Sequence, residues 1–320
     1  MNIILEVEKP LLELEDKIKE LKEVNLTGKI DLTNEIEALE KKADILKKSI
    51  YENLSPWDKV LMSRHPLRPN CLDYIKTIFT DFFELHGDRL FGDDPSMICG
   101  FAKLEERTVA VVGQQKGKDT KENIARNFGM VNPEGYRKSA RVMNMAAKFG
   151  FPIITFVDTP GAYPGLEAEE RGQFEAIARN ILLMSQLPVP IITIIIGEGG
   201  SGGALAIAVG DKILMPENSI YSVISPEGCA SILWRDSSKA AQAAAALALT
   251  APDLLKLGII DEIIPEPMGG AHADSEAVFI TVKNIIIRHL KELSKLSHSK
   301  LLNSRYEKYR KMGVFSEAEN

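Results

Sequence analysis

Two segments of this chain repeat one pattern, in which a β-branched apolar run leads into a glycine-rich turn and then into helical periodicity. The run at 151–155 precedes a turn at 158–165, and the run at 189–196 precedes a turn at 197–203. Between them, apolar residues spaced three and four apart predict a helix at 174–184. A strand-turn-helix unit used twice predicts parallel strands whose turns gather at one edge of the sheet, where open α/β sheets bind ligands.

Further short apolar runs predict the other strands of an α/β domain. These runs lie at Thr108–Val112, Lys212–Met215, Ile220–Ile224 and Ile259–Ile264. The alanine-rich stretch 240–249 predicts a helix. The basic amphipathic stretch from His289 to Lys311 predicts one surface or interface helix.

The first fifty residues instead have the period of helices. Their apolar residues fall three and four apart in two series: Leu11, Leu14, Ile18 and Leu21, then Ile36, Leu39, Ala43, Leu46 and Ile50. Gly28 lies between the series and predicts a break. We therefore expect a helical hairpin arm at residues 1–55, followed by an α/β domain with C-terminal helices at residues 56–320.

Composition excludes several classes of protein. A net charge of −6 argues against nucleic-acid binding by the whole chain. The three cysteines form no Cys-x-x-Cys pair and the five histidines show no metal-ligand spacing, so we expect neither a disulfide framework nor a metal site. The chain start lacks a signal-peptide pattern, and no uncharged apolar run reaches about 18 residues. We expect a cytoplasmic protein that does not enter a membrane.

The glycine-rich segment at 197–203 admits two familiar sites. Gly199-Gly200-Ser201-Gly202-Gly203 matches Gly-x-Ser-x-Gly, which would make Ser201 the nucleophile of a serine hydrolase. Its partners would come from Asp236 or Asp261 and from His272 or His289. The glycines at 197, 199 and 202 also match the dinucleotide fingerprint, with Glu217 as the ribose-binding acid.

A third interpretation needs no reactive side chain. Glycine lets main-chain N–H groups at the start of a helix approach a ligand oxygen. The amides of Gly202 and Gly203 would stabilise negative charge that develops on a carbonyl-type oxygen. A second donor would come from the sister turn at 158–165.

A basic segment supports an anionic ligand. Residues 114–148 hold eight basic and three acidic side chains, an excess of five positive charges in an acidic protein. Phosphates or an acidic protein partner are the natural counterparts, and a solvated helix face is the alternative. The candidate contacts are Lys116, Arg126, Arg137 and Lys138.

Several longer motifs carry a resemblance to a known family. They are Arg64-His65-Pro66, 114–117, 126–130, 133–138, 158–165, 197–206, 221–230 and 265–272. Together they resemble the alpha subunits of bacterial acetyl-coenzyme A carboxylase carboxyltransferases, from the helical arm to near the C-terminus. The resemblance implies a crotonase-like fold, a spiral of ββα turns.

The resemblance also implies a reaction. A carrier protein would present carboxybiotin, which loses CO₂; the freed biotin would take a proton from acetyl-coenzyme A, and the resulting enolate would capture CO₂ to give malonyl-coenzyme A. A beta subunit would complete an α₂β₂ enzyme that works with a biotin carboxylase. No covalent cofactor and no metal would belong to this chain. A non-catalytic scaffold is the alternative role.

By the same resemblance, Gly202 and Gly203 would hold the ureido oxygen of biotin, with Gly161 and Ala162 flanking from the sister turn and the 199–200 glycines contacting substrate. Related hydratases carry a catalytic Glu after the glycine turn, where this chain has Ala204 and Leu205. Hydration is therefore not expected. Glu227 lies near a second hydratase acid, but we interpret the Pro226-Glu227 pair as a helix start.

Overall fold

One mixed sheet organises the computed structural model, which describes residues 6–26 and 32–313. Its strands are β1 (Thr80–Glu84), β2 (Met97–Leu104), β3 (Arg107–Gln114), β4 (Ile153–Thr159), β5 (Ile191–Gly200), β6 (Lys212–Pro216), β7 (Ile220–Ser222) and β8 (Glu262–Ile264). The order is β1-β2-β3-β4-β5-β6-β8, and β7 pairs with the end of β5. The pairs β1–β2 and β2–β3 are antiparallel, whereas β3 to β8 run parallel. The predicted parallel strands are confirmed, and the antiparallel pair β1–β2 was not predicted.

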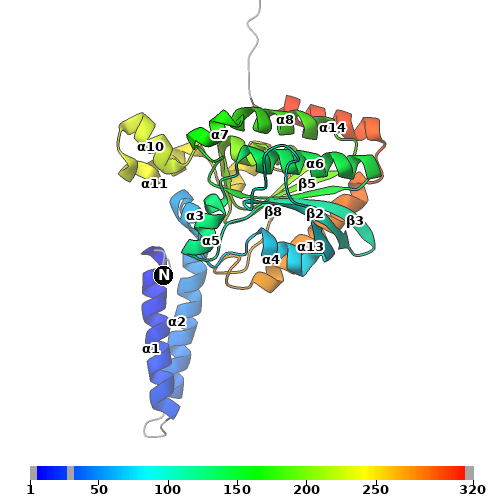
Figure 1. The fold of residues 1–320 in the computed structure, drawn as a ribbon. Coiled ribbons are helices and arrows are strands. Elements are labelled where there is room, and N and C mark those ends of the chain that lie inside the picture. The colour runs from blue at the N-terminus through cyan, green and yellow to red at the C-terminus, as the bar shows by residue number, and fades with distance from the viewer. Residues whose placement is uncertain (1–5, 27–31, 314–320) are drawn as a thin grey trace, which may run out of the picture.

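Helices cover both faces of this sheet, because successive residues of a strand point to opposite sides (Figure 1). In β3, Ala110 and Val112 pack in one core and Val109 and Val111 in the other. The first face is covered by α6 (Pro133–Phe149), α8 (Gln173–Gln186) and α14 (His298–Arg310), and the second by α4 (Cys71–Ile78) and α13 (Ser275–Leu293). Strands buried on both faces explain the continuous apolar runs in the sequence.

Shorter helices fill the connections. They are α3 (Pro56–Ser63), α5 (Thr120–Ala125), α7 (Leu166–Glu170), α9 (Ser201–Leu205), α10 (Pro226–Trp234), α11 (Ala240–Leu247) and α12 (Ala251–Lys256), with 3-10 turns at Glu6–Glu8, Asn127–Gly129 and Ser237–Lys239. The hairpin formed by α10 and α11 projects from one side of the sheet domain (Figure 1).

The N-terminal residues form the expected pair of helices, α1 (Lys9–Leu26) and α2 (Thr33–Glu52), which extend away from the sheet (Figure 1). One apolar seam joins them, and Leu11, Ile18, Ile36 and Ala43 are buried along it. Tyr51 Oη donates a 2.6 Å hydrogen bond to Glu8 at the end nearest the sheet domain. The predicted break at Gly28 lies outside the described residues.

The prediction of one surface helix from His289 to Lys311 is wrong. The chain forms two helices there, since α13 ends at Leu293 and α14 begins at His298, with Ser297 as its N-cap. The second helix packs against the sheet domain through Leu301 and Arg305, which are 2% and 1% exposed. Basic residues made this segment resemble a surface, but Arg305 is neutralised by the buried Asp211.

Candidate active site

The two glycine-rich turns meet, as the repeated pattern predicted. Strands β4 and β5 are neighbours, and Thr159 pairs with Gly199 at the carboxyl edge of the sheet. A Cβ added to Gly203 would lie 2.5 Å from the amide nitrogen of Ala162, and one added to Gly200 would lie 2.2 Å from the carbonyl oxygen of Pro160. Such distances require glycine at both positions, because real Cβ contacts are far longer. At these two positions the turns therefore touch through their main chains.

The amide donors at this corner differ in availability. No side chain caps α9, and the first N–H groups of a helix have no acceptor within it. Gly202 is half-buried, and a Cβ added there would meet nothing nearer than 3.7 Å. Gly203 is buried against the sister turn. The Gly161 N–H already donates to Thr159 Oγ1 at 3.1 Å, so Ala162 is the better candidate for the second donor.

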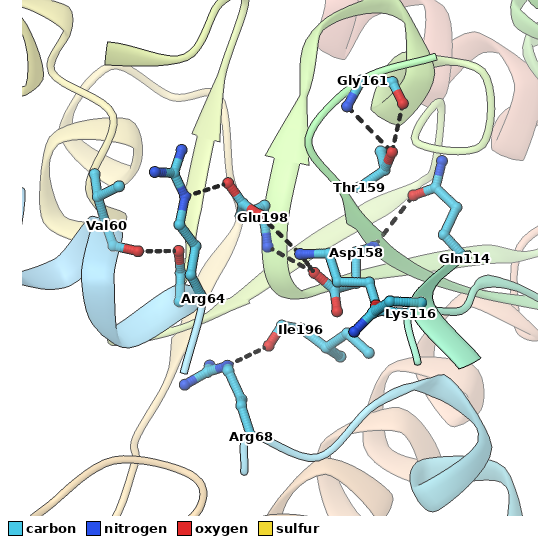
Figure 2. Close-up of polar contacts among 12 residues, drawn as sticks. Val60, Arg64, Arg68, Gln114, Lys116, Asp158, Thr159, Gly161, Ile196 and Glu198 are labelled. Atoms are coloured by element: carbon cyan, nitrogen blue, oxygen red, sulfur yellow. Dashed lines mark hydrogen bonds and ion pairs between the residues drawn. The ribbon is translucent and has the colours of Figure 1, made fainter. Parts of the chain in front are cut away.

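A chain of charged side chains lies beside the corner (Figure 2). Lys116 Nζ contacts Asp158 Oδ1 and Glu198 Oε2, both at 2.8 Å. Arg64 Nε donates to Glu198 Oε1 at 2.7 Å, and Arg64 Nη1 donates to Glu227 at 2.5 Å. Because Asp158 and Glu198 lie near the carboxyl ends of β4 and β5, these contacts fix the ends of the two strands together.

This chain of charges also sets the protonation of Glu198. Burial alone would raise the pKa of this carboxyl group, but Lys116 and Arg64 outweigh burial and lower that pKa to about 2. Burial likewise opposes the charge of Lys116, while Asp158 and Glu198 raise the pKa of its ammonium group. Glu198 and Lys116 are therefore charged at neutral pH, and Glu198 is unsuited to act as a general base.

A cavity of about 320 Å³ opens next to these residues. It is lined by side chains that include Arg64, Arg68, Lys116, Lys118, Asp158 and Glu198. Each of the four cations has a carboxylate partner: Arg64 contacts Glu198 and Glu227, Arg68 contacts Glu266, Lys116 contacts Asp158 and Glu198, and Lys118 contacts Asp73. A smaller hollow lined by Gly199 and Gly200 adjoins it, since both include Arg64 and Glu198.

Of the four basic residues named from the sequence, Lys116 lines this cavity. Arg126 bonds Glu122 and the carbonyl of Pro95 instead. Arg137 Nε donates to Asp88 at 2.7 Å, and Lys138, which is 0% exposed, donates to Asp93 at 2.6 Å. The last two side chains hold loop 88–94 against α6.

The structure does not assemble the serine hydrolase triad. Ser201 has φ +53°, which fits a nucleophile elbow. Each proposed partner nevertheless has another contact. His289 bonds Glu262, and His272 stacks on His65. Asp261 pairs with Lys308, and Asp236 accepts a hydrogen bond from the amide of Ser238 as the N-cap of the 3-10 turn Ser237–Lys239. The hydrolase interpretation is therefore not supported.

The dinucleotide interpretation is wrong. The fingerprint needs its glycines in the turn between strand and helix, but Gly197 and Gly199 lie inside β5. The carboxylate of Glu217 accepts from the amide of Glu266. By contrast, Glu227 stands in the first turn of α10 behind the N-cap Ser225, as the expected helix start requires.

Sequence reasoning missed the roles of Asp158 and Glu198. Each is a carboxylate at the end of an otherwise apolar strand, next to a glycine-rich turn. A carboxylate buried at the end of an apolar strand needs a cation as its partner. This requirement is the sequence signal that could have pointed to Lys116 and Arg64 as partners of Asp158 and Glu198.

Features of two other classes of protein are missing from the described residues, 6–26 and 32–313. No helix in these ranges has the length and apolar character to cross a membrane. In the same ranges, no cluster of three or more His, Cys, Asp or Glu side chains is arranged to hold a metal ion.

Known proteins resemble this chain in sequence along nearly its whole length. Residues 4–313 match the family model described as acetyl co-enzyme A carboxylase carboxyltransferase-like. An acetyl-coenzyme A carboxylase carboxyl transferase subunit alpha from Geobacter metallireducens is 60% identical, with 98% of each chain covered. The protein of the same name from Oceanobacillus iheyensis is 56% identical over 98% of this chain and 99% of its own.

Solved structures share the fold at lower identity. Transcarboxylase 12S superimposes with a TM-score of 0.55 at 19% identity, covering 77% of this chain and 42% of its own. A chain of a Pseudomonas malonate decarboxylase hetero-tetramer gives 0.56 at 18% identity, covering 67% of this chain and 86% of its own. These likenesses show the predicted crotonase-like α/β fold. Together with the match over residues 4–313, they establish that this chain belongs to the acetyl co-enzyme A carboxylase carboxyltransferase-like family.

Proposed function

We propose that this chain is the alpha subunit of the carboxyltransferase of acetyl-coenzyme A carboxylase. It transfers the carboxyl group of carboxybiotin to acetyl-coenzyme A, which gives malonyl-coenzyme A for fatty acid synthesis. The observation that carries this proposal is 60% identity to a protein of that name over 98% of both chains. The enzyme is an α₂β₂ complex in the cytoplasm, and it receives carboxybiotin on a carrier protein that a biotin carboxylase loads.

In this proposal the corner between the two turns is the oxyanion site. The amides of Gly202 and Gly203 bind the ureido oxygen of biotin, and Ala162 completes the site from the sister turn. The main-chain contact between the turns supports this assignment, because it brings the donors of the two turns next to each other. Gly161 shapes the turn, since its own amide donates to Thr159.

Biotin would supply both the carboxyl group and the base, which accords with a site where Glu198 is held as a carboxylate by two cations. The chain's own residues bind and orient. Gly199 and Gly200 line the hollow beside the corner, and Lys116 lines the adjoining cavity. We assign these residues to substrate contact. Contact of Arg126, Arg137 and Lys138 with an anionic substrate stays a prediction. Each of these side chains bonds groups of its own chain.

The proposal is tested by assaying this chain and its beta subunit separately and mixed. Malonyl-coenzyme A formation from acetyl-coenzyme A and carboxybiotin is expected only in the mixture. Activity of the beta subunit alone would reduce this chain to a scaffold. Absence of turnover in a mixture that forms the α₂β₂ complex would contradict the assigned reaction.

A further inference from the structure

One buried side chain bonds both glycine-rich turns at once. Gln114 is the last residue of β3, and it is 0% exposed. Its Oε1 accepts from the amide of Asp158 at 3.1 Å, at the start of the first turn, and its Nε2 donates to the carbonyl oxygen of Gly203 at 2.7 Å, in the second. Figure 2 shows the contact with Asp158.

We infer that Gln114 is a positioning residue, which aligns the main-chain donors of the oxyanion corner through the Gly203 carbonyl. This inference rests on the proposed function. In a helical residue the N–H and C=O groups point in opposite directions along the axis, so a fixed carbonyl fixes the direction of the amide. Tyr136 Oη approaches the same oxygen at 3.4 Å, too far to replace the shorter bond.

The network around Asp158 shows why this side chain matters more than its neighbours. Asp158 Oδ1 accepts from the amide of Glu198 at 3.0 Å and contacts Lys116, so these bonds join β4 to β5. None of these bonds of the Asp158 side chain reaches α9. Gln114 extends the network from Asp158 to Gly203, the residue that carries a proposed donor. Because Gln114 is fully buried, water cannot readily take over the lost bond in a variant.

The chemistry of this position requires an amide. A glutamine side chain offers one acceptor and one donor group, and Gln114 uses both. An ionised glutamate would keep the acceptor for Asp158 but would face the Gly203 carbonyl with a second acceptor. A protonated glutamate would again have a donor. Burial favours protonation of a carboxyl group, so the defect of Gln114→Glu should depend on pH.

The test compares the α₂β₂ complex carrying Gln114→Glu with one carrying Asn180→Asp. Asn180 is the matched control, because it is also a buried side-chain amide, 1% exposed. It donates to Ser139 and bonds neither turn. We expect Gln114→Glu to lower kcat about 10- to 100-fold with less than about a 3-fold change in KM for acetyl-coenzyme A. The loss should shrink from about pH 8 to about pH 6. Asn180→Asp should leave kcat within about 2-fold of the unsubstituted complex.

Gln114→Met provides the second variant, because it removes the strong donor without burying a charge. It should show the loss of kcat at every pH, and it also keeps the inference testable if Gln114→Glu does not fold. Normal kcat in either folded variant, or a loss in Gln114→Glu that ignores pH, would overturn the positioning role alone. An unsubstituted complex without turnover would overturn the proposed function, and this inference with it.

Discussion

Arg305 anchors the C-terminal helix, and its removal should destabilise the whole sheet domain. Its guanidinium group contacts both oxygens of Asp211 at 2.8 Å. It also donates to the carbonyl oxygens of Met184, Leu187 and Val189, at 2.6, 2.8 and 2.9 Å. The side chains of Arg305 and Asp211 are 1% and 4% exposed. One residue of α14 therefore satisfies buried acceptors at the end of α8, before β5 and before β6.

The size of the effect follows from what Arg305→Ala leaves behind. Asp211 would keep its bond from the amide of Ile191 but lose its counter-ion inside the protein. Removing one partner of a buried ion pair costs about 3–5 kcal/mol, because the remaining charge is uncompensated. For a chain of 320 residues about 1 kcal/mol corresponds to roughly 1.5 °C. The expected fall in melting temperature is therefore about 4–8 °C.

The assay is thermal unfolding of the isolated chain, followed by circular dichroism, with Arg310→Ala as the control. Arg310 lies in the same helix but is exposed, so its loss should shift the midpoint by less than about 2 °C. Adding Asp211→Asn to Arg305→Ala should restore part of the stability, since it removes the stranded charge. Equal midpoints for Arg305→Ala and Arg310→Ala would refute the argument.

Three further predictions concern Gly203, Ser201 and His272. Gly203→Ala should destabilise the chain by about 1–3 kcal/mol in urea unfolding and abolish malonyl-coenzyme A formation, because the added Cβ would lie 2.5 Å from the Ala162 amide nitrogen. Gly202→Ala is the control. Its Cβ would meet nothing nearer than 3.7 Å, so this variant should match the unsubstituted chain in stability. Ser201→Ala should retain substantial carboxyltransferase activity, and complete loss would return a nucleophile to consideration. Burial lowers the pKa of His272 from 6.5 to about 4, so on acidification the unfolded chain binds a proton at this residue before the folded chain does. Stability should therefore fall as pH decreases from about 6.5 towards 4. His272→Gln should reduce that fall in urea midpoints measured at about pH 7 and pH 5. An identical pH dependence in both proteins would exclude His272 as its source.

Local sequence determined the regular elements and the location of the site. The hairpin helices follow from helical periodicity, and β4 and β5 follow from continuous apolar runs. Both signals need only neighbouring residues to be read. Gly200 and Gly203 indicate from the sequence a close approach of main chain, and the structure has that approach at both positions. Two similar units in one chain were enough to predict that both turns lie at the same edge of the sheet.

Tertiary structure alone decided which polar side chains serve that edge. Gln114, Asp158 and Glu198 lie in three different strands, and Lys116 follows the first of them. The contacts of these four residues span 40 to 89 positions in sequence. The same holds for Arg305, which a local pattern assigns to the surface and the fold buries against Asp211. A buried polar group must find its partner wherever the chain brings one. Periodicity records which face of an element is apolar, but it carries no information on which distant donor will meet a given acceptor.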